Sequence, residues 1–159
     1  MPVEAPFIAH RGEVLPGWAD DNHHMNLAYY LVMFDAASDV VFEELQIGQA
    51  YRQQADSTCF AAETHLVYER EMNVGDKATI LTTIIDVDKK RLHLAHEMFR
   101  EGETSRACLQ EIMFINVNLT SRRSVPWTDE AMRCLSDALA AHSILPRPLK
   151  LGRSIQIPR

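Results

Sequence analysis

The stretch Asn26–Leu45, NLAYYLVMFDAASDVVFEEL, decides the fold of this chain. Between Leu27 and Phe42 the only charged residues are Asp35 and Asp39, and most of the others are apolar. A helix at the surface of a globular protein has an apolar stripe opposite a polar face, whereas a helix that is apolar nearly all round is buried. We therefore predict one long buried helix, about 30 Å in length at 1.5 Å per residue, that other elements must wrap.

The residues on either side of this helix predict an antiparallel sheet. Segment 60–71 alternates between two faces, and segment 77–87 is rich in Thr, Ile and Val, as β-strands are. Further strands are expected at 7–15, 91–99 and 104–119. Thr128 or Asp129 can cap a short amphipathic helix near the C-terminus. We predict an α+β fold in which one antiparallel sheet wraps around the long helix, with an extra C-terminal helix.

The length and composition of the chain favour one domain. Its 159 residues contain no internal repeat, low-complexity tract or Gly/Ser linker. We expect a single domain over residues 1–159, with its core at about 8–120 and the C-terminal helix and tail at 121–159. A single sheet curled around one helix leaves an edge strand without a partner, and such folds commonly pair with a second copy. We expect a homodimer or a dimer of dimers.

Charge and hydropathy exclude several classes of partner. The net charge of -6 and the pI near 5.6 argue against nucleic acid. No apolar run approaches the roughly 20 residues of a membrane-spanning helix, and the first residues lack the pattern of a signal peptide. The three cysteines, Cys59, Cys108 and Cys134, have no CxxC spacing, which argues against disulfides and structural zinc. We expect a cytoplasmic protein without membrane association.

The nine residues Trp18–Asn26, WADDNHHMN, gather ionisable and amide side chains directly before the long helix. The free N–H groups and the macrodipole of a helix N-terminus favour negative charge there. A carbonyl at this end would be polarised by amides such as that of Leu27, and Asp20 could be the nucleophile or the base that activates a water. The alternative is structural: Asn26 caps the helix, while Asp20 and Asp21 bond turn amides.

Three motifs, in order, give the chain a family resemblance. They read W-x-D-x-N-x-H-M-N-x-A-Y-Y from Trp18 to Tyr30, E-x-H-x-x-Y-x-x-E from Glu63 to Glu71, and D-x-K-R-L-H from Asp88 to His93. On these motifs the sequence resembles hot-dog thioesterases of the 4-hydroxybenzoyl-CoA type over residues 8–120, and within them the betainyl-CoA thioesterases of carnitine degradation. The resemblance implies the hot-dog fold and hydrolysis of a short acyl-CoA, with betainyl-CoA as the leading candidate, to free acid and coenzyme A.

The resemblance also implies roles for residues of the first motif. Asp20 corresponds to the catalytic carboxylate, and the start of the helix, with Asn26 and the Leu27 amide, corresponds to the oxyanion site. His24 is expected to fix the loop by hydrogen bonds. The family's usual Gly is His23 here. Because a Gly often supplies a φ above zero or a close approach of the backbone to substrate, we expect His23 to narrow the space beside the thioester.

Candidate substrate-binding residues occur in all three motifs. Trp18 and Tyr30 could lie against a quaternary ammonium acyl group by cation–π attraction, or pack in the core. Glu63 and His65 are two apart on a predicted strand, so they share a face, either in the cleft or on a solvated or dimer-interface surface. His93 is expected to line the acyl pocket or to be structural.

Lys90 and Arg91 belong to the sharpest basic cluster of the chain, at a predicted hairpin. They could contact the phosphates of coenzyme A, or be solvated residues of a turn. His93 and His96 are three apart and would face opposite sides of a strand, so we expect no metal site and no cofactor beyond the coenzyme A of the substrate. Two other functions stay open on the same fold: an enoyl-CoA hydratase or dehydratase, and a non-hydrolytic acyl-CoA-binding protein.

Overall fold

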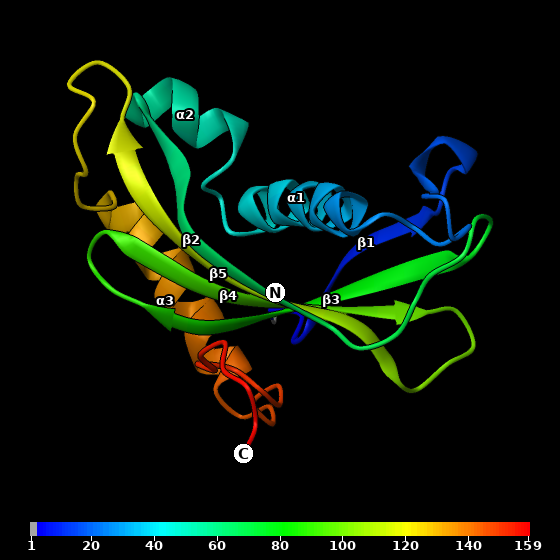
Figure 1. Ribbon diagram of the computed structural model, residues 1–159. Coiled ribbons are helices and arrows are strands. Elements are labelled where there is room, and N and C mark those ends of the chain that lie inside the picture. The colour runs from blue at the N-terminus through cyan, green and yellow to red at the C-terminus, as the bar shows by residue number, and fades with distance from the viewer. Residues whose placement is uncertain (1–2) are drawn as a thin grey trace.

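Five antiparallel strands form one curved sheet, and the long helix α1 (Leu27–Glu44) lies on its concave face (Figure 1). The computed structural model describes residues 3–159. In sheet order the strands are β1 (Phe7–Glu13), β3 (Lys77–Val87), β4 (Arg91–Arg100), β5 (Arg106–Asn118) and β2 (Ser57–Tyr68). The other helical elements are η1 (Pro16–Trp18), α2 (Gln49–Ala55) and α3 (Asp129–His142). The predicted combination of an antiparallel sheet, one long helix and a C-terminal helix is confirmed.

The short helix α2 was not predicted from the sequence. Its seven residues are too few to show an amphipathic pattern, and most of them are polar. A tertiary contact satisfies its N-terminus instead, since Glu43 Oε1 at the end of α1 accepts a hydrogen bond from Gln49 N (2.7 Å). α2 therefore depends on the end of the preceding helix.

The long helix α1 buries one face and exposes the other. Its buried side chains are those of Tyr30, Met33, Phe34, Ala37, Ser38 and Val41. Leu27, Leu31, Val32 and Val40 are 40–64% exposed. The prediction of a helix buried nearly all round is therefore wrong for one chain, because the sheet curls under only one side of α1 (Figure 1).

A polar network lies between α1 and the sheet. His96 of β4 is fully buried, and its Nε2 lies 3.0 Å from Ser38 Oγ of α1 while its Nδ1 lies 2.6 Å from Thr82 Oγ1 of β3. Burial lowers the pKa of His96 to about 3, so the ring is neutral at physiological pH. The two hydroxyl groups give a buried histidine the partners that it requires.

The opposite face of the sheet carries α3 and the C-terminal tail (Figure 1). His142, in the last turn of α3, accepts a hydrogen bond at Nδ1 from Ile84 N of β3 (3.1 Å). The outer strand β2 pairs with β5 alone, so within the described residues its other edge has no partner strand. No helix among residues 3–159 is long and apolar enough to cross a membrane.

Candidate functional site

The residues before α1 fold into a small hairpin, residues 18–26. Asn26 N donates to Trp18 O (2.8 Å), and Asp20 N donates to His24 O (2.9 Å). These two bonds pair the strand that leaves η1 with the strand that leads into α1. Asp20 is thereby held near the start of the helix rather than on a free loop.

The loop after β2 holds this hairpin in place. Met25 N donates to Met72 O (2.7 Å), and His24 and Asn73 form an antiparallel bridge. His24 Nδ1 also lies 3.5 Å from Glu71 Oε2, at the end of the second motif. The predicted role of His24 in fixing the loop agrees with these contacts, which join the first and second motifs.

The tip of the hairpin is a tight turn at Asp20–His23. His23 N donates to Asp20 O (2.9 Å), and Asn22 N donates to the carboxylate oxygen Oδ1 of Asp20 (2.9 Å). His23 has a φ of 64°, in the left-handed region that glycine adopts most easily. The structural alternative is thus partly realised, because one Asp20 oxygen bonds a turn amide. Among residues 3–159 no hydrogen-bond donor is found for the other oxygen, Oδ2.

The first turn of α1 offers a free amide. The Asn26 side chain accepts from Ala28 N (3.0 Å), and the Asn26 carbonyl accepts from Tyr29 N (3.0 Å). Neither bond uses the Leu27 amide, for which no acceptor is found within the described residues. Leu27 is 64% exposed, so this end of the helix is accessible. An oxyanion beside Leu27 would meet a free N–H and the positive end of the macrodipole.

Aromatic side chains surround the first turn of α1. Trp18 stacks on Tyr29 with ring centroids 5.1 Å apart. Tyr30 is buried, and its hydroxyl accepts from Met72 N (3.1 Å) and donates to Arg70 O (3.4 Å). Burial raises the pKa of Tyr30 to about 12. Both predicted aromatic residues, Trp18 and Tyr30, therefore lie beside the candidate site, and Tyr30 is also a core residue.

Tyr68, the last residue of β2, joins this group, although the sequence analysis did not select it. Its hydroxyl donates to Leu27 O in the first turn of α1 (3.1 Å), and its ring meets Tyr30 edge-on at 5.2 Å. The ring is 47% exposed. The signal was present in the second motif, in which Tyr68 is the central aromatic residue, but the contact with α1 needed the fold.

Glu63, His65 and His93 lie on the other face of the sheet. His65 pairs with Glu111 of β5, and Glu111 Oε1 lies 2.9 Å from His93 Nε2. Phe114 of β5 packs on α1, and Glu111, three residues away along the strand, points to the opposite face. The prediction that Glu63 and His65 share a face is confirmed. The expectation that these residues and His93 line one cleft with Asp20 is wrong, because side chains alternate across a sheet.

Lys90 and Arg91 lie at the far end of the sheet from the hairpin. The Asp20 end is marked by Glu13 of β1, which pairs with the first residue of β3. The basic cluster follows the last residue of β3, so the length of an eleven-residue strand, roughly 33 Å, separates the two. Lys90 Nζ donates to Ser124 O (3.1 Å). One chain therefore does not bring the basic cluster to Asp20.

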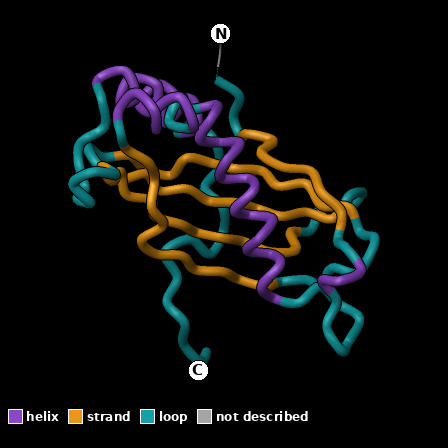
Figure 2. Tube along the Cα trace, turned by 90° about the horizontal axis from the view of Figure 1, so that it is seen from above, coloured by secondary structure: helices purple, strands orange, loops and turns teal. Residues whose placement is uncertain are grey.

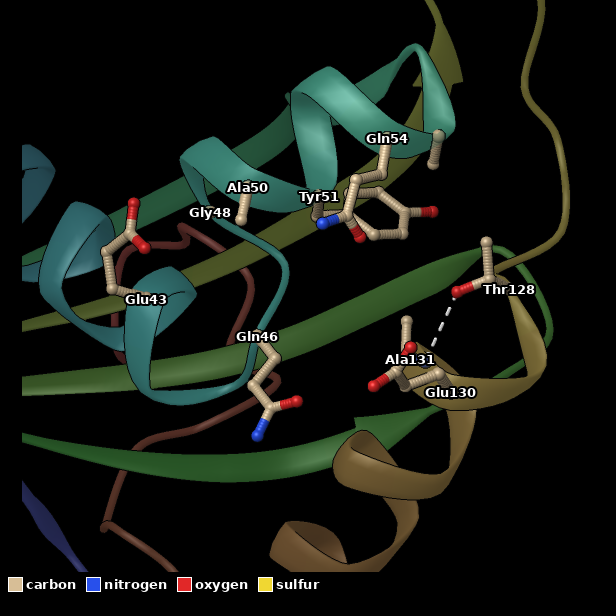
Figure 3. A pocket seen from close by; sticks show the side chains of 10 residues that line it. Glu43, Gln46, Gly48, Ala50, Tyr51, Gln54, Thr128, Glu130 and Ala131 are labelled. Atoms are coloured by element: carbon tan, nitrogen blue, oxygen red, sulfur yellow. Dashed lines mark hydrogen bonds between the residues drawn. The ribbon is translucent and has the colours of Figure 1, made fainter.

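A cavity of about 380 Å³ lies between α2 and the start of α3 (Figure 3). Tyr51 and Gln54 line it from α2, and Thr128 and Glu130 from the start of α3. It is found beyond the C-terminal end of α1, so the eighteen residues of that helix, about 27 Å, separate it from Asp20. Among residues 3–159 no three His, Cys, Asp or Glu side chains are grouped to hold a metal ion. We place the candidate site at the hairpin.

The family of the chain follows from comparison with known proteins. Residues 14–135 match the family described as the Thioesterase-like superfamily. The chain belongs to this superfamily. The hot-dog fold and the thioesterase class predicted from the three motifs are confirmed at this level.

Individual relatives narrow the comparison. The betainyl-CoA thioesterase of Pseudomonas aeruginosa is 32% identical over 145 residues, which cover 91% of each chain. An L-carnitine dehydrogenase/betainyl-CoA thioesterase of Agrobacterium fabrum is 32% identical over 158 residues, 99% of this chain and 32% of that protein, so the chain spans only part of it. The structure of a hypothetical protein from Staphylococcus aureus in complex with CoA has a TM-score of 0.88 at 26% identity, covering 99% of this chain and 100% of the other.

Proposed function

We propose that this chain hydrolyses a short acyl-CoA thioester to free acid and coenzyme A, and that betainyl-CoA is its substrate. The observation that carries the proposal is the pairing of two free groups around one hairpin: the Asp20 oxygen without a donor and the Leu27 amide without an acceptor. The similarity to the Pseudomonas aeruginosa betainyl-CoA thioesterase along 91% of both chains supports the choice of acyl group.

The chemistry uses the start of α1 as an oxyanion site. The thioester oxygen accepts from the Leu27 amide, and the macrodipole stabilises the negative charge that develops on it. Asp20 either attacks the carbonyl carbon, giving an anhydride that water then cleaves, or removes a proton from the water that attacks. In both routes the C–S bond breaks and coenzyme A leaves as a thiolate. No cofactor beyond the coenzyme A of the substrate is required.

The aromatic residues suit a quaternary ammonium group. The Tyr68 ring is half exposed beside the first turn of α1, and Trp18 stands on the same turn through its contact with Tyr29. A cation over such a ring gains about 0.5–2 kcal/mol. Tyr30 supports the Tyr68 ring edge-on from the core. We infer that these rings hold the trimethylammonium end of the acyl group.

We also propose a homodimer formed along β2, whose outer edge has unpaired backbone groups. Antiparallel pairing of β2 with its copy, about a twofold axis, reverses the direction of every strand of the second sheet. The basic hairpin of the second copy then reaches the end of the joint sheet at which Asp20 of the first copy lies. Lys90 and Arg91 would therefore contact the coenzyme A phosphates of the opposite active site. Two such dimers could associate further.

A panel of acyl-CoAs tests the function, with coenzyme A release followed by a free-thiol reagent. We expect release from betainyl-CoA to exceed release from aromatic and long-chain substrates. Asp20→Asn is expected to lower kcat at least about a hundredfold, because the carboxylate acts on the reacting carbon. Asp21→Asn, which removes the neighbouring exposed carboxylate, is the matched control and should retain activity.

The same assay separates the other functions of this fold. Near-normal thiol release by Asp20→Asn would show that the mechanism is wrong. Hydration of an enoyl-CoA without thiol release would identify a hydratase. Tight binding of an acyl-CoA, with neither reaction, would identify a binding protein.

A further inference from the structure

The C-terminal tail, residues 143–159, is tied to the face of the sheet away from α1. Arg106 Nη2 of β5 donates to Leu149 O (3.0 Å), and Lys150 Nζ donates to Glu69 Oε1 (2.5 Å). The hydrogen bonds from Arg106 hold the pKa of Glu69 at about 2, so this carboxylate stays charged at physiological pH. The tail thus begins its course across the sheet with two charge-assisted bonds.

A third bond fixes the tail further along. Gly152 N donates to Glu111 Oε2 (2.7 Å), and the other oxygen of this largely buried carboxylate is bonded by His93. The next residues, Ser154 and Ile155, line a cavity of about 460 Å³ together with the middle of β2. The tail therefore runs from β5 to β2, towards the free edge of the sheet.

The end of the tail carries apolar side chains that the chain itself does not cover. Ile155 and Ile157 are 88% and 83% exposed, and their alternation with polar residues is typical of an extended segment that buries one face. Figure 2 shows the C-terminus outside the outline of the sheet, on the side opposite the N-terminus. Because the N-terminal residues lead into β1, the opposite edge is β2.

The charge of the tail is opposite to that of the rest of the chain. Residues 143–159 hold four basic side chains and no acidic one, whereas the other residues hold 12 basic and 22 acidic side chains. Lys150 is paired within its own chain, and Arg153 and Arg159 lie in the exposed last part. An acidic surface next to the β2 edge would attract this segment.

We propose that residues 154–159 are an arm that crosses the β2 edge and docks on a second copy of this chain. The inference rests on the homodimer proposed above. In that dimer the corresponding face of the second β2 lies next to the end of the tail. Phe60, Glu63 and Val67 share this face of β2 with His65, so the face offers apolar contacts for the two isoleucines and a carboxylate for the arginines.

Sedimentation over a range of concentrations tests the arm. The double variant Ile155→Asp, Ile157→Asp is expected to raise the dimer Kd at least tenfold, because two apolar anchors are lost and negative charge is added to an acidic surface. Ile144→Asp is the matched control, because Ile144 is 85% exposed but precedes all three tail bonds. Its Kd should stay within twofold of wild type. A double variant with the wild-type Kd overturns the inference.

Cross-linking locates the arm directly. A photoreactive p-benzoylphenylalanine at position 157, in a mixture of ¹⁴N and ¹⁵N protein, should give links between a light tail and the heavy β2. Links confined to one isotope overturn the inference, as does binding of the wild-type tail to phosphatidylserine vesicles with an unchanged Kd in the double variant. A monomeric wild-type chain would overturn both the arm and the homodimer, while thiol release tests the catalytic proposal separately.

Discussion

At the scale of single residues, His23 shows what the family's glycine does at this position. Its φ of 64° lies in the left-handed region, so the turn at the tip of the hairpin requires a conformation that costs a side-chain-bearing residue about 1–2 kcal/mol. The turn is kept because Asp20 bonds two of its amides. The strain therefore lies directly beside the candidate catalytic carboxylate.

His23→Gly is expected to raise the free energy of unfolding by about 0.5–1 kcal/mol. Relief of the left-handed conformation outweighs the extra entropy that glycine gives the unfolded chain. Urea unfolding measures the change. Asn22→Gly, at the adjacent exposed position of the same turn, is the control and should lower stability or leave it unchanged. Destabilisation by His23→Gly would contradict the argument.

His96 makes stability depend on pH. The unfolded ring takes up a proton below about pH 6.5, whereas the folded ring, with a pKa of about 3, does not. This contribution is complete above pH 6.5 and decreases as the pH falls towards 3. The loss should approach 1.4 kcal/mol per pH unit, or about 2 kcal/mol at pH 5. Unfolding of wild type and His96→Gln at pH 7 and pH 5 measures it, and equal losses in both proteins would refute it.

At the scale of elements, the end of β2 and the start of α1 act as one unit. Tyr68 bonds the first turn of the helix, while the loop after β2 bonds the hairpin through the Met72 carbonyl. A strand that follows the helix in sequence thus sets the position of its N-terminus. The sequence predicted each element separately, but hydrogen bonds between segments about forty residues apart have no local signature.

Tyr68→Phe is expected to lower kcat several-fold with a smaller effect on KM. The variant keeps the ring beside the acyl group but loses the bond to the Leu27 carbonyl, worth about 1 kcal/mol. The oxyanion site is therefore held less firmly. Steady-state thiol release measures both constants. Tyr51→Phe, which removes a tyrosine hydroxyl in the distant α2–α3 cavity, should be unaffected; an equal loss in both variants would rule out this positioning role.

At the scale of the whole molecule, the sheet determines which motifs can meet. The first motif and the end of the second converge at the start of α1, because the loop after β2 returns to the hairpin. The third motif lies a strand's length away, and Glu63 and His65 lie on the opposite face. A second copy, related by a twofold axis, is the simplest arrangement that brings the basic hairpin to the candidate site.

The sequence by itself determined the long helix, the antiparallel strands, the capping role of Asn26 and the hairpin segment with Asp20. These depend on periodicity, composition and residues close together in the chain, which are local properties. Only the tertiary structure decided which face of α1 is exposed, on which side of the sheet Glu63, His65 and His93 lie, and that Tyr68 reaches the helix. The physical reason is that strand register and sheet curvature, which no short segment specifies, decide these contacts.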